Sequence, residues 1–199
     1  MPNKAIAILT KILRPEIGLS KSRLETLCLI VIGMVSARGV NLSHLACERT
    51  GTVRTTSTYR RLQSFFQHVR LDEDWVLPLR VRLLGLNKTW LIALDRTDWQ
   101  IGKTEVNFLV LAVVTRRFRV LLVWSVIEGR GCPDTGMRIA LIERYLAHFP
   151  AATIRLLLAD REFVGAEWME FLCENNVPFA IRIRDNLRIA TEDGHDLTL

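Results

Sequence analysis

Two aspartates, Asp95 and Asp160, each follow a short apolar run in this 199-residue chain. Asp95 follows Trp-Leu-Ile-Ala-Leu, and Asp160 follows Ile-Arg-Leu-Leu-Leu-Ala. Apolar runs of this length predict buried strands. Ligands of open α/β sheets bind at the carboxyl ends of the strands, so aspartates that end two parallel neighbours would meet there. Such a pair can coordinate divalent metal ions, which activate a nucleophile and stabilise the leaving oxygen of a phosphodiester.

Two further carboxylates, Asp98 and Glu162, compete for these positions. Asp98 lies three residues after Asp95, and on an extended chain their side chains point to opposite faces, so only one can serve. Asp95 is preferred because it directly follows the apolar run. Glu162 is the weaker candidate because it lies past the predicted strand end. A single strand-ending Asp often caps a turn, but two at matching positions favour a metal pair.

The elements that must position these aspartates occupy residues 88–199. The sequence predicts strands over 90–94, 108–114, 120–127, 154–159 and 177–183, and helices over 134–148 and 165–175. The order is β-β-β-α-β-α-β, in which the first strands form an antiparallel meander and the later ones are parallel. This is the arrangement of an incomplete ribonuclease-H-like mixed sheet, so the predicted fold class is α/β.

The preceding residues, 1–87, are predicted to form a separate all-helical segment. Its expected helices begin near Ser20, at Asn41 or Ser43, near Thr55 and at the acidic run 72–74. Gly39 is expected to end the first of them in the left-handed conformation. The domain boundary is placed after residue 87, where the apolar strands begin.

Charge is unevenly distributed between these two parts. Residues 1–87 hold 13 Lys/Arg against 6 Asp/Glu, a net charge of +7, and residues 88–199 hold 14 against 15, a net charge of −1. A basic front segment suggests a polyanion partner. Its third predicted helix follows a Gly-containing turn, as in a helix-turn-helix. The side chains expected to contact DNA are Arg54, Arg60, Arg61 and Gln67. A helical bundle with a solvated basic surface is the alternative.

Other features of the sequence indicate the cell compartment in which the protein resides. The longest uncharged stretch of the front half, 26–37, has 12 residues, which is too short to span a membrane. The N-terminus lacks the pattern of a secretory signal. The four cysteines are widely spaced and are expected to be reduced thiols. The sequence therefore predicts a cytoplasmic protein that does not bind membranes.

The two aspartate segments also resemble a known family. Residues 94–99 (Leu-Asp-Arg-Thr-Asp-Trp) and 159–163 (Ala-Asp-Arg-Glu-Phe) are similar to the first and second aspartate segments of bacterial DDE transposases of the insertion-sequence-4 type. The segment 59–66 and the predicted helix over 134–149 are supporting matches. Together these matches cover nearly the whole chain.

This resemblance implies that the protein binds double-stranded DNA at the terminal inverted repeats of a transposon, and cuts and transfers its strands with Mg²⁺ or Mn²⁺. It implies that Asp95 and Asp160 are the metal ligands. Arg161 would lie near the DNA backbone, or would serve in packing. The implied partners, besides DNA, are a second copy of the chain or a full-length transposase. The implied location is the bacterial cytoplasm, with nucleoid association when DNA is bound.

The sequence departs from the family after Asp160. The family has a β-rich insertion after the fifth strand, which residues 182–189 and a turn at Gly194 would begin, and then a helix that carries a catalytic Glu. No Tyr-x-x-Arg-x-x-x-Glu pattern follows Asp160, and the available glutamates occur in a different context, namely Glu167, Glu170, Glu174 and Glu192. The chain is therefore expected to be a truncated transposase that exposes apolar sheet surface near its fifth strand.

Two other functions are compatible with these residues. One is a non-catalytic DNA-binding protein, either a repressor of transposition or a transposase remnant. The other is a ribonuclease-H-like nuclease that acts on RNA–DNA hybrids, which the basic helical leader disfavours.

The missing third carboxylate generates a first prediction. Purified residues 1–199 should cleave inverted-repeat DNA orders of magnitude more slowly than a complete DDE site, because two carboxylates do not fix a two-metal geometry. A gel assay with labelled repeat DNA and Mg²⁺ measures this, with EDTA as the control. Robust Mg²⁺-dependent cleavage would contradict the prediction.

Overall fold

The computed structural model describes residues 2–72, 74–86, 88–127, 133–183, 188–190 and 196–198. The chain forms two compact units, Met1–Val76 and Leu77–Leu199. The sequence placed its boundary later, after residue 87. The structural division falls earlier because helix α5 (Val76–Leu83) buries Leu77 and Val81 in the core of the second unit.

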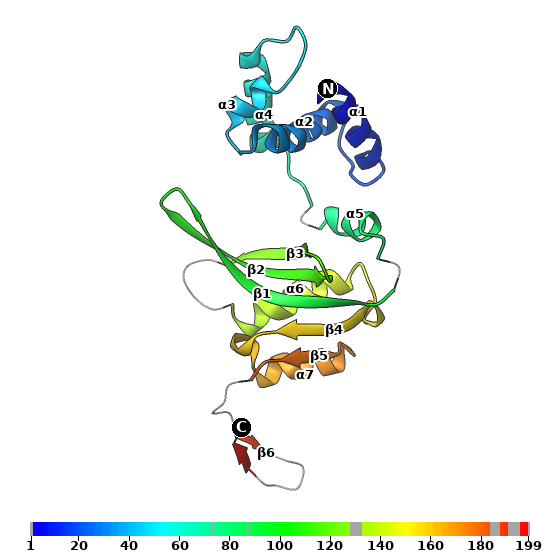
Figure 1. The fold of residues 1–199 in the computed structure, drawn as a ribbon, viewed down its shortest axis with the longest axis vertical. Coiled ribbons are helices and arrows are strands. Elements are labelled where there is room, and N and C mark those ends of the chain that lie inside the picture. The colour runs from blue at the N-terminus through cyan, green and yellow to red at the C-terminus, as the bar shows by residue number, and fades with distance from the viewer. Residues whose placement is uncertain are drawn as a thin grey trace. The chain divides into compact units, whose positions relative to one another are not determined.

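Helices build the first unit (Figure 1), namely α1 (Pro2–Leu13), α2 (Lys21–Ala37), α3 (Leu42–Cys47) and α4 (Thr55–His68). Helix α1 was not predicted, although it contacts α2 through a hydrogen bond from Thr10 Oγ1 to Cys28 Sγ of 3.4 Å. Asn41 caps α3 as expected, since its side chain accepts a hydrogen bond from the Ser43 amide. Among the described helices, none is both long and apolar enough to cross a lipid bilayer.

The predicted left-handed position of Gly39 was wrong. The residue that ends α2 with a positive φ is Arg38, at φ 49° and ψ 42°, and its amide bonds to the Met34 carbonyl. The Gly39 amide also bonds to Met34 O, at 3.3 Å. The left-handed residue that ends α2 is thus one position earlier than the glycine, which is the residue that most often adopts this conformation after a helix.

A five-stranded mixed sheet forms the centre of the second unit (Figure 1), with the order β3-β2-β1-β4-β5. Its strands are β1 (Trp90–Ile101), β2 (Thr104–Val114), β3 (Arg119–Ile127), β4 (Ile154–Ala159) and β5 (Phe179–Ile181). The pairs β1–β2 and β2–β3 are antiparallel, whereas β1–β4 and β4–β5 are parallel. With α6 (Thr135–Leu146) and α7 (Ala166–Glu174), this confirms the predicted element order and the ribonuclease-H-like fold class.

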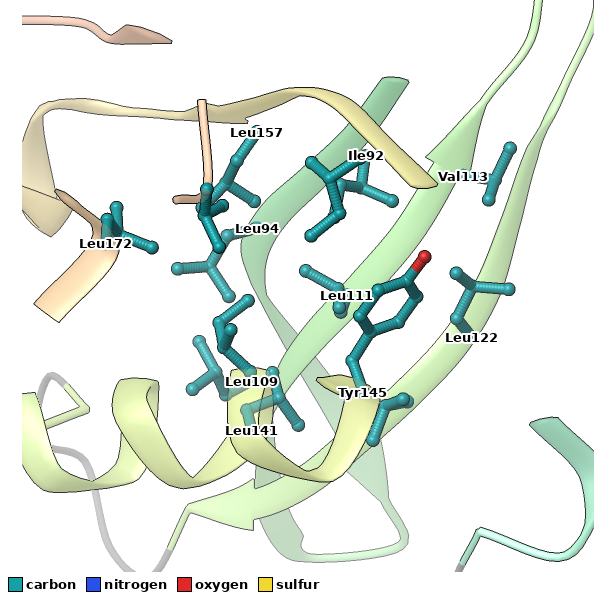
Figure 2. Packing of buried hydrophobic residues seen from close by; sticks show 14 of the residues in the cluster. Ile92, Leu94, Leu109, Leu111, Val113, Leu122, Leu141, Tyr145, Leu157 and Leu172 are labelled. Atoms are coloured by element: carbon teal, nitrogen blue, oxygen red, sulfur yellow. The ribbon is translucent and has the colours of Figure 1, made fainter. Parts of the chain in front are cut away.

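One face of the sheet packs against α6 and α7. Figure 2 shows Leu141 and Tyr145 of α6 and Leu172 of α7 in one buried cluster with strand residues such as Leu157. All of these side chains are fully buried. As predicted, Asp134 caps α6, because its carboxylate accepts a hydrogen bond from the Met137 amide at 2.7 Å. Burial of this apolar face is the main source of stability in the unit.

The β1–β2 hairpin is longer than the sequence indicated. The predicted first strand ended at residue 94, but β1 continues to Ile101 and β2 begins at Thr104, with Gly102 at φ 64° in the turn between them. The extension was missed because its residues are mixed polar and aromatic, not a continuous apolar run. Trp99 and Phe108 form an edge-to-face pair there, with ring centroids 5.7 Å apart.

Arginines from two helices cover the free edge of β3. Arg80 of α5 donates hydrogen bonds to the Leu121 and Leu122 carbonyls, and its guanidinium lies 4.9 Å from the Trp124 ring centroid. Arg144 of α6 donates to the Trp124 carbonyl at 3.0 Å. An edge whose carbonyls already accept hydrogen bonds is a poorer template for pairing with another strand. Burial lowers the pKa of Arg80.

The other face of the sheet keeps large apolar side chains exposed. Trp99, Leu121 and Val126 are 55%, 41% and 55% exposed. The register places Val126 beside Phe108, and Phe108 beside Thr97, so these side chains share the face opposite α6. The sequence analysis expected an exposed apolar surface near the fifth strand, but in the described residues of the sheet the largest exposed apolar side chains lie on β1 and β3.

Beyond β5, the short strands β6 (Arg188–Ala190) and β7 (Asp196–Thr198) pair antiparallel, and the predicted Gly194 turn lies outside the described residues.

This exposed face generates a second prediction. Replacing Leu121 and Val126 together with Glu should reduce self-association and the fluorescence of a hydrophobic dye, because the change removes exposed apolar area from an edge strand. Sedimentation velocity and dye titration measure the effect. The matched control is Val35→Glu, which changes a 76% exposed valine of the helical unit. Equal behaviour of the double variant and the control would contradict the prediction.

Candidate functional site

Asp95 and Asp160 lie next to each other across the parallel β1–β4 pair. The register pairs Leu94 with Ala159, and each aspartate is the next residue of its chain. Neighbouring residues in a parallel register point to the same side of the sheet, so both aspartates lie on the face opposite α6. The structure thus brings together two residues that are 65 positions apart in the sequence.

Asp95 has a polar and accessible environment. Its side chain is 54% exposed, and its Oδ1 accepts a hydrogen bond from the Arg96 amide at 2.9 Å. Its Oδ2 lies 3.9 Å from Nη1 of Arg119, which reaches it from β3. An accessible carboxylate beside a cation remains available to bind a metal ion or to face a phosphate.

The two rival carboxylates point elsewhere. Asp98 pairs in register with Asn107, and with Arg96, Gln100 and Glu105 it lines a polar hollow on the other face of the hairpin. Alternation along β1 therefore separates Asp98 from Asp95, as the sequence analysis expected. Glu162 instead forms an ion pair with Arg96, with 3.7 Å between Oε2 and Nε.

The donors at the aspartate pair suit a hard divalent cation. Mg²⁺ and Mn²⁺ prefer carboxylate oxygens and retain several waters, so two aspartates supply an appropriate but incomplete ligand set. Within the described ranges, no group of three or more His, Cys, Asp or Glu residues is arranged to hold a metal ion. Glu167, Glu170 and Glu174 lie on α7, and Glu192 lies outside the described residues.

A short turn follows Asp160 and contains Arg161. Asp160 is extended, with φ −84° and ψ 172°, and its carbonyl accepts a hydrogen bond from the Phe163 amide at 3.0 Å. Arg161 is exposed beside Asp160, whereas the Phe163 ring is fully buried and anchors the turn. The sequence analysis did not single out Arg138, which contacts this turn from α6. The sequence held one indication of its role, because this charged residue lies among the apolar positions of the predicted helix.

In the helical unit, α4 has a buried face and a polar face. Thr58, Leu62 and Phe65 are buried. Arg60 and Gln67, which are seven residues apart and therefore on one side of the helix, are exposed, and so is Arg54 at the N-cap. These three predicted DNA-contacting residues are thus accessible to a partner.

Arg61 faces into the helical unit instead. Its Nε donates to Thr26 Oγ1 at 2.6 Å, and its Nη2 donates to the Ser22 carbonyl at 2.6 Å. Its guanidinium also lies 3.7 Å from Glu25. These contacts tie α4 to α2, so Arg61 contributes to packing within the unit.

The difference between adjacent arginines is a third prediction. Arg61→Ala should destabilise the helical unit by about 1–3 kcal/mol, because it removes charge-assisted hydrogen bonds and leaves Thr26 and Ser22 without this donor. Arg60→Ala is the matched control and should change stability by less than about 0.5 kcal/mol, since its side chain is exposed. Urea unfolding followed by circular dichroism compares the two. Equal stabilities would contradict the structural role of Arg61.

Comparisons with known proteins agree with the sheet region. Residues 86–196, more than half of the chain, match the family model described as transposase DDE domain. None of the curated proteins compared with the chain matches it. A solved structure that matches is the cryo-EM structure of the simian T-cell lymphotropic virus intasome in complex with PP2A regulatory subunit B56 gamma. The identity is 10% and the TM-score 0.35, over 72% of this chain and 47% of the other.

The chain thus spans about half the length of that matched chain. The family match includes all five strands of the sheet and both aspartates. On this evidence the chain belongs to the transposase DDE domain family.

Proposed function

We propose that the protein acts in DNA transposition, with the helical unit binding the terminal inverted repeats of the transposon and the sheet unit acting on its strands. The observation that carries this proposal is the register Leu94–Ala159, which makes the two aspartates neighbours inside the family match. The resemblance to insertion-sequence-4 transposases supports the finer assignment.

In this proposal Asp95 and Asp160 hold Mg²⁺ or Mn²⁺. Bound metal would supply Lewis-acid stabilisation of the oxygens of a phosphodiester. Arg119, beside Asp95, and the exposed Arg161, beside Asp160, would provide positive charge toward the DNA backbone. The two carboxylates bind the metal weakly without a third, so residues 1–199 alone have little or no cleavage activity.

The proposed DNA-binding surface is the polar side of α4. A helix fits the major groove of B-DNA, which is about 12 Å wide. The exposed Arg54 and Arg60 suit phosphate or guanine contacts, and Gln67 suits an adenine edge. Arg61 supports this surface from behind by fixing α4 against α2.

A second candidate function is a DNA-binding repressor of transposition without catalysis. The observation in its favour is that the helical unit and the aspartate pair lie in separate compact units, so binding does not require a complete catalytic site. Such a chain would occupy the terminal repeats or pair with a full-length transposase. A ribonuclease-H-like nuclease is the third alternative, and preference for an RNA–DNA hybrid over duplex DNA would favour it.

Binding to terminal-repeat DNA is the fourth prediction. Residues 1–199 should bind a labelled duplex carrying the repeat of the element more tightly than a scrambled duplex, at two salt concentrations. Arg60→Ala should weaken binding to both duplexes and lower the salt slope by about one, because it removes one phosphate contact. Gln67→Ala should instead reduce the preference for the repeat, since a good base contact provides about 1–3 kcal/mol of discrimination.

The control for these variants is Arg23→Ala, which removes an exposed arginine from α2 of the same unit. It should leave the preference for the repeat unchanged. Equal, salt-sensitive binding to both duplexes by the wild-type chain would show that only a basic surface is present and would contradict sequence-specific recognition. Retained preference together with inhibition of strand cleavage by a full-length transposase would favour the repressor.

A further inference from the structure

Arg138 of α6 is one of the few charged side chains buried in the described part of the chain. It is 7% exposed. Its Nε and Nη2 both donate to the Pro133 carbonyl, at 3.2 and 2.9 Å, and Nη2 also donates to the Glu162 carbonyl at 3.2 Å. The guanidinium lies 5.3 Å from the ring centroid of Phe163. Burying a charged group costs free energy, so a buried guanidinium held by these contacts indicates a specific role in the structure.

Among the described residues, the hydrogen bond and the ring contact that Arg138 makes beyond its own helix terminus fall on the turn that follows Asp160. Glu162 and Phe163 belong to that turn, and the Phe163 amide closes it by bonding to the Asp160 carbonyl. The backbone at Gly165, just after the turn, also lies close to the guanidinium, since a Cβ there would be at ordinary contact distance, 4.0 Å, from Nη1 of Arg138. The side chain thus connects the N-terminal end of α6 to the backbone that carries the second aspartate.

The first aspartate is connected to the same turn. Arg96, the residue after Asp95, pairs with the Glu162 carboxylate at 3.7 Å, while the Glu162 carbonyl accepts from Arg138. Glu162 is therefore contacted from both sides, by β1 through its side chain and by α6 through its main chain. Because Glu162 belongs to the turn after Asp160 and Arg96 follows Asp95, these contacts connect the turn that carries Asp160 to the strand that carries Asp95.

We propose that Arg138 is a positioning residue that holds the Asp160 turn in the geometry required for a divalent cation shared with Asp95. Arg138 acts through the Glu162 carbonyl and the Phe163 ring and does not touch the metal or the DNA. The inference rests on the proposed metal-binding role of the two aspartates. Partners outside the ligand shell commonly change metal affinity by about 10–100-fold.

The chemistry of the contact requires arginine. Two donors on one planar group reach the Pro133 carbonyl, and one of them also bridges to the Glu162 carbonyl, while the guanidinium carbon lies over the Phe163 ring. A lysine retains the charge but lacks the forked donors and the planar face. Methionine retains most of the apolar length and removes both the charge and the donors.

Local order of the turn is the first readout, measured by amide hydrogen exchange of the Phe163 amide in Arg138→Met and Arg138→Lys. The Leu157 amide of β4, which bonds to the Pro178 carbonyl at 2.7 Å, serves as an internal reference for opening of the sheet. Exchange at Phe163 should increase by about tenfold or more relative to Leu157, because the turn loses the hydrogen bond that a charged donor makes to the Glu162 carbonyl.

Metal affinity is the second readout, measured by Mn²⁺ titration of the wild type and the variants through paramagnetic broadening of the Arg96 and Arg161 amide signals. Both Arg138 variants should bind Mn²⁺ about tenfold more weakly than the wild type. The matched control is Arg144→Met on the same helix, whose arginine donates to the Trp124 carbonyl and the Ser125 hydroxyl of β3. It should leave both readouts unchanged.

The outcomes separate this inference from the function on which it rests. Wild-type protein that takes up no Mn²⁺ would overturn the metal pair itself, and the exchange at Phe163 would still show whether Arg138 orders the turn. Mn²⁺ affinity that is equal in the wild type and the Arg138 variants would overturn the positioning role. If Arg138→Met does not fold, Arg138→Lys decides the question, and a lysine variant identical to the wild type in both readouts would refute the proposal.

Discussion

The parallel pairing of β1 with β4 is the contact on which the sheet unit depends. It joins two segments 65 positions apart and ends at the pair Leu94–Ala159, directly before the two aspartates. The pair is held in register by burial, since Ile92, Leu94 and Leu157 all pack beneath α6 and α7. A slip of one residue would turn these leucines and this isoleucine to the opposite face and separate the carboxylates, so core packing and site geometry are set by the same register.

One face of the sheet contributes mainly to stability, and the other carries the candidate functional residues. Alternation along each strand directs one set of side chains to the helices and the other to the face that carries Asp95 and Asp160. The part of the helix-covered face that packs beneath α6 and α7 is apolar and buried (Figure 2), whereas the aspartate face keeps Trp99, Leu121 and Val126 accessible. Changes on the aspartate face are therefore expected to alter binding and association more than folding.

Several arginines have structural tasks that the net charge conceals. Arg61 ties α4 to α2, Arg80 and Arg144 bond to the carbonyls of the edge strand β3, and Arg138 holds the turn after Asp160. Each guanidinium directs its donors to protein oxygens, which suits a planar group with several donors. The basic composition of the chain thus overstates the charge available to DNA, and exposed arginines such as Arg60 are the more relevant measure.

The sequence by itself determined the order of the strands and helices in the sheet unit and the choice of Asp95 and Asp160 as neighbours. It could do so because buried parallel strands are apolar runs and because an aspartate at the end of such a run is conspicuous. It did not determine the length of β1, whose second half is mostly polar with a single aromatic residue, Trp99, nor the end of α2 at Arg38. Only the tertiary structure decided which arginines face inward and that Arg138 meets the Asp160 turn. These long side chains bond largely to main-chain carbonyls. Every residue has a carbonyl, so the sequence does not indicate which one an arginine will reach.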